Sequence, residues 1–171
     1  VHGGRLVAKS SDGTVIQTPV GAYKEPESYD LTTKLIDQNG AAPADGLLAS
    51  AMWVPLGTGQ DDFDLMGNNS TVRLPAGRYA VLGTIQTVVP GQPLPTSTRV
   101  ADPEVDLHKD TVVTLDARNS KKVTVRTDEK DARPISWTNG MVVDTGARVV
   151  GYYSMSDNND YTAPTTKHTK E

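Results

Sequence analysis

The chain contains no cysteine among its 171 residues, and aromatic residues make up only 5% of it. Without cysteine the protein can form no disulfide, thiolate nucleophile or cysteine-ligated metal site. The absence is compatible with a location in the cytosol or on a bacterial exterior that uses no disulfides. The apolar fraction of 36% is also small and predicts a lean core. With so few aromatic side chains, we expect most of them to be needed in that core.

An excess of basic residues is also missing, since 17 lysines and arginines stand against 21 aspartates and glutamates, a formal net charge of −4. A phosphate backbone would find no electropositive stripe, so we expect no nucleic-acid partner. No apolar run approaches the ~20 residues of a membrane-spanning helix, and the first residues do not resemble a signal peptide. We therefore expect a soluble chain without a membrane partner, as a mature or excised piece.

What the sequence does contain is a series of short runs rich in valine, threonine and tyrosine, separated by glycine, proline, asparagine and aspartate. No long stretch repeats apolar residues at helical spacing, and turn residues recur about every ten positions. This pattern predicts an all-β chain of about eight to eleven strands, arranged as a β-sandwich with flanking hairpins.

The strands expected from this pattern cover residues 5–9, 14–19, 29–35, 47–55, 70–74, 78–89, 111–117, 122–127, 135–143 and 147–154. Four turns are expected to join neighbouring strands as pairs: Ser11-Asp12-Gly13, Pro75-Ala76-Gly77, residues 118–121 and Asp144-Thr145-Gly146. In residues 29–35, Tyr29, Leu31, Thr33 and Leu35 alternate with polar residues and should share a buried face. Residues 57–69, 90–95 and 128–133 and the tail from 156 to 171 are expected to be loops or a disordered end.

Prolines between residues 19 and 26 indicate a stiff connection of the kind that separates modules. We therefore expect a boundary near Glu25. Residues 1–24 would be the closing hairpin of a preceding β-module, residues 25–131 the β-sandwich, and residues 132–171 a hairpin and polar tail that could begin a further module.

Asp144 is the strongest catalytic candidate, because an apolar strand followed by Asp-Thr-Gly is how some proteases present a catalytic aspartate. A triad also needs a histidine base and a nucleophile, whereas His2, His108 and His168 lie outside the apolar strands and no serine elbow is present. The expected role of Asp144 is therefore in a hairpin turn, and we expect the chain not to be an enzyme.

The loop around Asp61, Asp62 and Asp64 offers carboxylate oxygens that calcium accepts, but it lacks the spacing of an EF-hand. It is either a calcium site or a solvated loop, and no other cofactor is expected. The cluster at residues 157–160 is a weaker version of the same pattern. Asn69-Ser70-Thr71 matches a glycosylation acceptor, but the pattern is short enough to occur by chance, and we interpret it as a turn leading into a strand.

Aromatic side chains on a β-sandwich can stack on sugar rings, which makes Trp53 and Trp137 candidate ligand contacts, with Tyr152 and Tyr153 as further ones. The alternative is that these rings fill the core. A carbohydrate- or cell-wall-binding module is therefore the second functional hypothesis from the sequence.

Four segments, taken in order, resemble a known family: residues 18–27 (TPVGAYKEPE), 29–32 (YDLT), 72–79 (VRLPAGRY) and 110–118 (DTVVTLDAR). They resemble the long non-catalytic region that follows the peptidase domain in large secreted subtilisin-like serine peptidases of Streptomyces and related actinobacteria. The resemblance covers roughly residues 5–135. It implies a transthyretin-like, carboxypeptidase-regulatory-like or immunoglobulin-like sandwich, a secreted location and a covalently attached peptidase domain as partner, and it carries over no catalytic residue.

Residues 34–40 (KLIDQNG) also resemble the first strand of collagen-adhesin B-type domains, in which the lysine forms an isopeptide bond. The assisting glutamate of that family has no counterpart after Tyr79, where Gly83 stands instead, and Lys34 alternates onto the solvated face. We therefore interpret Lys34 as an ordinary strand lysine. The leading hypothesis is an accessory module that provides spacing, stability, or contact with a protein or polysaccharide surface.

Overall fold

A computed structural model describes residues 2–44, 49–58, 63–132, 136–156 and 160–163. Within these ranges the chain forms thirteen strands and no helix, so the all-β prediction is confirmed. The strands are β1 (His2–Lys9), β2 (Val15–Ala22), β3 (Ser28–Ile36), β4 (Ala49–Pro55), β5 (Asp64–Met66), β6 (Thr71–Pro75), β7 (Gly77–Thr87), β8 (Thr96–Leu107), β9 (Thr111–Asp116), β10 (Lys121–Lys122), β11 (Trp137–Asp144), β12 (Val149–Ser156) and β13 (Asp160–Thr162).

Two sheets form the sandwich. The larger has the strand order β10-β13-β8-β7-β4-β5, and the smaller has the order β6-β3-β9. The main core lies between them and draws buried side chains from both, including Leu31, Leu35, Val81, Ile85 and Leu115. Apolar residues on the facing sides of two sheets bury each other in this way because strand side chains alternate between the faces.

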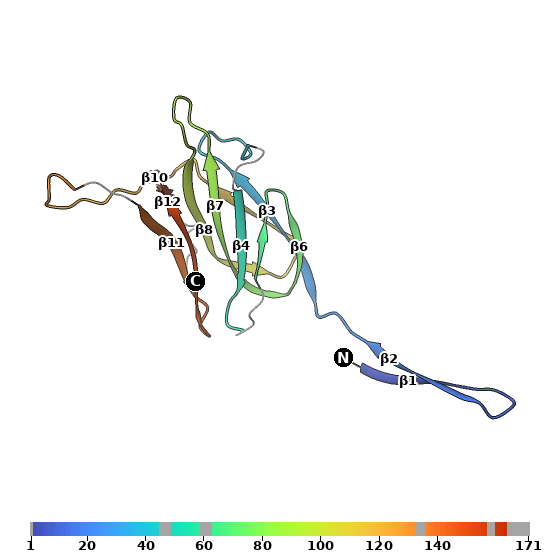
Figure 1. The fold of residues 1–171 in the computed structure, drawn as a ribbon. Helices are drawn as coiled ribbons and strands as arrows, with labels where there is room; N and C mark the ends of the chain where they lie inside the picture. Colours follow the sequence, from blue (N-terminus) through green and yellow to red (C-terminus); the bar gives the residue numbers. More distant parts are fainter. Residues whose placement is uncertain (1, 45–48, 59–62, 133–135, 157–159, 164–171) are drawn as a thin grey trace.

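The β11–β12 hairpin forms a third layer on the outer face of the larger sheet (Figure 1). The buried residues beneath it come from β4, β7 and β8, namely Met52, Val54, Leu82 and Ala101. The hairpin residues packed against them are Met141, Val143, Val150 and Tyr152. β11, β12 and β13 therefore contribute strands and packing to the same sandwich as the strands from β3 to β9.

The β1–β2 hairpin extends away from the sandwich (Figure 1), and all sixteen of its strand residues are exposed. Its turn matches the prediction, with the Asp-Gly step placing Gly13 at a φ of 90°. The two strands pair from His2 with Ala22 to Lys9 with Val15. The boundary expected near Glu25 falls in the connection between β2 and β3.

The alternation expected in β3 is confirmed, because Leu31, Thr33 and Leu35 are buried while Lys34 is exposed. The hairpin expected around Asp144 is also present, with Gly146 at a φ of 82°. Both predictions depended on residues close together in the sequence, where turn chemistry and strand alternation act directly.

The pairing expected across Pro75-Ala76-Gly77 is wrong. β6 pairs with β3 in the smaller sheet, whereas β7 pairs with β4 and β8 in the larger one. The chain crosses from one sheet to the other at this step. A proline–glycine turn serves a crossing between facing sheets as well as a hairpin, so local turn chemistry does not distinguish them.

The pairing expected between residues 111–117 and 122–127 is wrong as well. β9 pairs in parallel with β3, and the second segment forms a strand only at β10, which pairs with β13. Val125, in the middle of the expected strand 122–127, is 70% exposed and therefore does not pack in a core. β5 and β13 lie inside the expected loop and tail, respectively.

The sequence pattern did not indicate β8, the longest strand, because Arg99, Asp102 and Pro103 interrupt its apolar alternation. β13 pairs with β8 only at Ser97, Thr98 and Arg99, so Pro103 lies on a part of the strand that no described neighbour covers on that side. Proline and charge are tolerated on such an edge, where they also discourage pairing with other chains.

Candidate functional site

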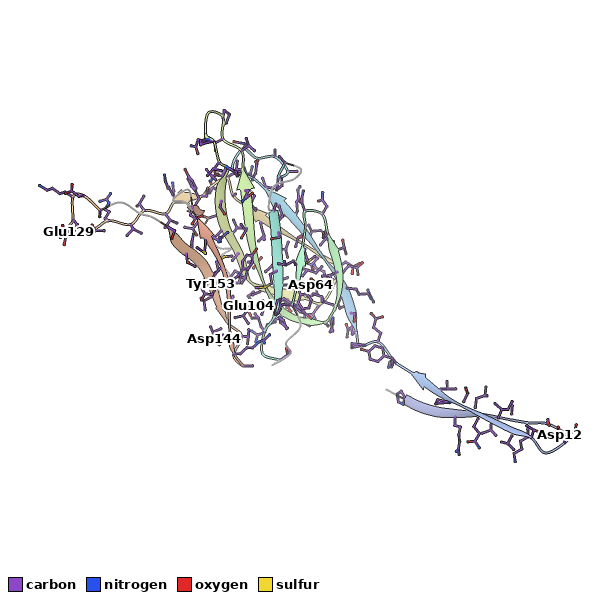
Figure 2. The ribbon with its side chains drawn as sticks, in the orientation of Figure 1. Asp12, Asp64, Glu104, Glu129, Asp144 and Tyr153 are labelled. Atoms are coloured by element: carbon purple, nitrogen blue, oxygen red, sulfur yellow. The ribbon has the colours of Figure 1, made fainter. Side chains whose placement is uncertain are left out.

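The turn that carries Asp144 borders an open cleft of about 450 Å³ at one end of the sandwich. Its lining is Leu56, Arg78, Pro103, Glu104, Val142, Val143, Asp144, Thr145 and Gly146. Figure 2 shows Asp144 at the end of the β11–β12 hairpin. The turn is anchored to the sheet because the amide of Gly57 donates to the Thr145 carbonyl at 2.7 Å.

Each polar group of this cleft already has a structural role. Asp144 Oδ1 accepts from the Gly146 amide at 2.8 Å, as expected of an aspartate in a turn. Arg78 and Glu104 form an ion pair at 2.8 Å. The Thr145 hydroxyl donates to the Arg148 carbonyl at 3.0 Å. The described lining can offer charge and hydrogen bonds to a polar ligand, but it places no histidine beside a hydroxyl.

The three histidines considered as bases are not brought to Asp144 in the described part of the chain. His108 pairs with Asp106 at 2.9 Å on the surface, and the lining of the Asp144 cleft does not include it. His2 begins the projecting hairpin. His168 lies outside the described residues.

The acidic loop is described only in part. Asp64 begins the short strand β5, where it is exposed and its Oδ1 accepts from the Leu65 amide at 2.7 Å. Asp61 and Asp62 lie outside the described residues, as do residues 157–159. Among the residues that the structure does describe, no three carboxylate or imidazole side chains gather closely enough to hold a metal ion.

Trp53 is in the core rather than on the surface, which corrects its assignment as a ligand-contact residue. The side chain is 7% exposed and meets Tyr79 edge-on, with ring centroids 6.0 Å apart. Burial raises the pKa of Tyr79, whose hydroxyl donates to the Pro75 carbonyl at 2.8 Å. A ring packed in this way has no free face for a sugar.

Of the other aromatic candidates, Tyr152 and Tyr153 lie on opposite faces of the β11–β12 hairpin. Trp137 begins β11, but its side chain is outside the described part of the structure. Tyr152 is half-buried, and its hydroxyl lies 3.1 Å from that of Ser50. Tyr153 is 60% exposed on the opposite face (Figure 2).

The remaining motif residues occupy ordinary positions. Lys34 is exposed on β3, and Asn69 takes a φ of 57° in the turn before β6. The neighbouring Asn68 accepts from the Leu35 amide at 2.8 Å through Oδ1, which ties this turn to β3. The turn interpretation of the glycosylation-like motif therefore has a structural basis.

Sequence reasoning missed a buried polar cluster beneath the β11–β12 hairpin. Arg99 is 2% exposed and donates to the Thr84 hydroxyl at 2.6 Å, while its Nε and Nη2 have no hydrogen-bond partner among the described residues. Asp160 is fully buried, and neither carboxylate oxygen has a partner in the same part of the chain. Burial lowers the pKa of Arg99, and the charge of Asp160 opposes that shift. No sequence signal pointed to this cluster, because Arg99 follows the polar run Thr96-Ser97-Thr98 and charged residues are mostly exposed.

No protein-family model, curated protein or solved structure matches the chain. The described residues include no helix with the length and hydropathy required to span a bilayer. The structure therefore defines this chain as an all-β sandwich protein with a projecting hairpin.

Proposed function

We propose that the chain is a non-catalytic structural module of a secreted subtilisin-like serine peptidase, where it spaces or stabilises its neighbours. The observation that carries the structural role is the β1–β2 hairpin, whose residues are exposed along both strands. An isolated two-stranded hairpin is at best marginally stable in water, so such a hairpin calls for a neighbour. We propose that this neighbour is a preceding β-module in the same polypeptide.

The two faces of the hairpin differ in a way that supports this proposal. One face carries Leu6, Ile16 and Val20, which are 63%, 67% and 50% exposed. The other carries Arg5 and Gln17, which are joined by a hydrogen bond of 3.2 Å, and it also exposes two valines, Val7 (43%) and Val15 (46%). Apolar side chains are thus exposed on both faces, and the face without lysine or arginine is the more apolar of the two, as expected of a sheet face that packs against a neighbour.

The connection between β2 and β3 is held to the sandwich by two contacts, which we call the fastening. Glu25 forms an ion pair with Arg73 at 2.8 Å, and this contact raises the pKa of Arg73. The carbonyl of Glu27 accepts from the Ala76 amide at 2.7 Å. These contacts, together with Pro26 in the connection, hold the base of the hairpin at a defined place on the sandwich.

The peptidase context is supported by the four segments that, taken in order along the chain, resemble the family. These segments, 18–27, 29–32, 72–79 and 110–118, span part of the hairpin, the connection and the sandwich. Two of them supply the residues of the fastening, Glu25 and Arg73. The features that resemble the family are thus also the ones that join the hairpin to its sandwich.

Hydrogen exchange on the whole chain tests the structural role. We expect the amides of β1 and β2 to exchange faster than those of β3, β7 and β8 by about a hundredfold or more, because no core protects the hairpin. Protection of β1 and β2 equal to that of the sandwich, in dilute protein, would contradict the proposal.

A matched pair of variants tests the fastening. Arg73→Ala should let the hairpin reorient more freely, which ¹⁵N relaxation would detect in β1 and β2. Arg78→Ala removes an equally short and equally exposed ion pair that does not touch the connection, and should leave the hairpin relaxation unchanged. Equal behaviour of the two variants would count against a fastened spacer.

The peptidase context has its own tests. We expect the surrounding reading frame to encode a peptidase domain with a complete catalytic triad, and a frame without one would remove the context while leaving the spacer role open. We also expect the purified chain not to hydrolyse casein. Casein hydrolysis that disappears in Asp144→Ala would contradict the non-catalytic assignment.

A further inference from the structure

The outer face of the β11–β12 hairpin is an exposed apolar surface, which we call the Tyr153 face. It is built from four cross-strand pairs, Thr138 with Met155, Gly140 with Tyr153, Val142 with Gly151, and Asp144 with Val149. Its large apolar side chains are Val142 (56% exposed), Val149 (67%), Tyr153 (60%) and Met155 (78%). The opposite face of the same hairpin already packs on the larger sheet, so the Tyr153 face is apolar without serving that core.

Two glycines set the orientation of Tyr153. A Cβ on Gly140 would overlap Cδ1 and Cε1 of the ring, and a Cβ on Gly151 would overlap Cε2 and Cζ. The ring therefore occupies the space that both missing side chains would fill. Opposite edges of the ring, Cδ1–Cε1 and Cε2–Cζ, lie over the two glycine positions. The plane of the ring therefore lies along the hairpin surface and does not stand up from it. Its 60% exposure then belongs mainly to the face turned to solvent.

The size of the Tyr153 face argues against a protein partner. Strands of eight residues in a two-stranded hairpin cover about 27 Å by 10 Å, or roughly 270 Å². A stable protein interface needs about 800 Å² on each partner. The face is too small for a second copy of the chain to associate stably through it alone, whereas an elongated small ligand could cover it.

We propose that the Tyr153 face binds a polysaccharide of β-linked, gluco-configured sugar rings, with one ring stacked on Tyr153. In such rings every large substituent is equatorial, so each ring face presents axial C–H groups that pack on a flat aromatic face. Val142 and Val149 would continue the contact along the hairpin, because they lie on the same side between Tyr153 and the Asp144 turn. This inference does not depend on the structural role proposed above.

Polar groups for the sugar hydroxyls stand at the ends of the same face. Asp144 and Thr138 are both exposed there. Asp144 uses Oδ1 for the Gly146 amide, and its other carboxylate oxygen can accept from a hydroxyl. Asp144 is four residues along β11 from the partner of Tyr153, about 14 Å away. A ligand that reaches both must contain several rings, so binding should strengthen with chain length.

A titration of the whole chain with cellohexaose and chitohexaose, followed by ¹H–¹⁵N spectra, tests the proposal. Saturable shifts should centre on the amides of residues 138–144 and 149–155 at ligand concentrations up to about 10 mM, a range that includes weak millimolar affinities. Glucose should bind more weakly than the hexasaccharides. A β-linked galactan fragment should also bind more weakly, because its axial 4-hydroxyl interrupts one apolar ring face.

Four variants separate the stacking contact from the fold of the hairpin. Tyr153→Phe keeps the ring and should bind within about threefold of the parent, whereas Tyr153→Ala should bind at least tenfold more weakly. Gly151→Ala keeps every atom of Tyr153 but displaces the ring, and should also bind at least tenfold more weakly. Tyr23→Ala is the matched control, since Tyr23 is a 71% exposed tyrosine on the connection, away from the Tyr153 face, and should leave binding unchanged. The spectra of each variant report whether the hairpin still packs on the sheet.

Three results would overturn the proposal. The first is no saturable shift with either hexasaccharide. The second is undiminished binding by Tyr153→Ala with the hairpin intact. The third is a shift of the same amides with protein concentration in the absence of sugar, which would assign the face to self-association.

Discussion

Arg99 on β8 and Asp160 on β13 are opposite charges buried on the same face of neighbouring strands, and the described residues leave polar atoms of both without a hydrogen-bond partner. Parallel pairing places Asp160 opposite Ser97 and Thr162 opposite Arg99, so the two charges lie diagonally across the strand pair. The charge of Asp160 favours the protonated form of Arg99, against the burial that lowers its pKa. Asp160 thus offsets part of the effect of burial on Arg99.

This compensation predicts a coupled loss of stability. Asp160→Asn should lower the free energy of unfolding by about 3 kcal/mol, because it leaves the guanidinium buried without a counter-charge. Arg99→Met should have a cost of similar size for the corresponding reason. Urea unfolding measures both, and the double variant should cost clearly less than the sum of the two. Additivity within about 0.5 kcal/mol would show that the charges act independently.

Gly83 on β7 faces the smaller sheet closely enough for its lack of a side chain to matter. A Cβ there would lie 2.6 Å from Cδ1 of Leu115 and 3.3 Å from Cγ2 of Val100. Gly83→Ala should therefore destabilise the protein by about 1–2 kcal/mol through overpacking. In a Leu115→Val background, which removes a carbon from the crowded side, the same substitution should cost less. An equal cost in both backgrounds would contradict the packing explanation.

Leu31 and Leu6 provide a direct comparison of core and hairpin. Leu31 is fully buried in β3, whereas Leu6 in β1 is 63% exposed. Leu31→Ala should cost about 2–5 kcal/mol in the unfolding of the sandwich, and Leu6→Ala should change it by less than about 0.5 kcal/mol. Thermal unfolding monitored by the buried Trp53 measures both. A large effect of Leu6→Ala would mean that the hairpin packs on the sandwich.

Asp12 makes the turn of the β1–β2 hairpin sensitive to acid. It accepts hydrogen bonds from the Ser10 hydroxyl and from the Thr14 amide, the latter at 2.9 Å, and these bonds lower its pKa from 3.8 to about 2. Because the folded pKa is the lower one, the contribution of Asp12 to the turn is present above pH 4 and is lost as the pH falls through about 2. A carboxyl ¹³C titration should give this value. In Ser10→Ala, which removes the largest cause of the shift, the pKa should rise towards 3.8.

The parts of the fold that could be predicted from sequence are those set by neighbouring residues. The Asp-Gly turn at Gly13, the alternation of Leu31 and Leu35, and the hairpin around Gly146 all follow from turn chemistry and from the two-residue period of strands. The partners of β6 and β9 could not be predicted in this way, because each pairs with β3, to which it is not joined by a hairpin. Sheet membership of this kind is decided by long-range packing.

The candidate sites show the same division. The role of Asp144 as a turn residue could be predicted from its neighbours, whereas the burial of Trp53 depends on the facing sheet. The orientation of Tyr153 depends on Gly140 across the hairpin as well as on Gly151, so only the strand register brings the three together. Arg99 and Asp160 are 61 positions apart, and neither has a sequence motif that indicates the other.

The parallel strand β13 sets a requirement on how the protein matures. Its three residues follow β8 only after four other strands, β9 to β12, yet they lie between β10 and β8 and supply the buried Asp160 carboxylate. During synthesis, residues 160–162 must leave the ribosome before Asp160 can pack beside Arg99. In a nascent chain that is stalled before Asp160 is added, Arg99 would be solvated at the edge of an incomplete sheet. A C-terminal truncation that stops before Asp160 would leave the protein permanently in that state.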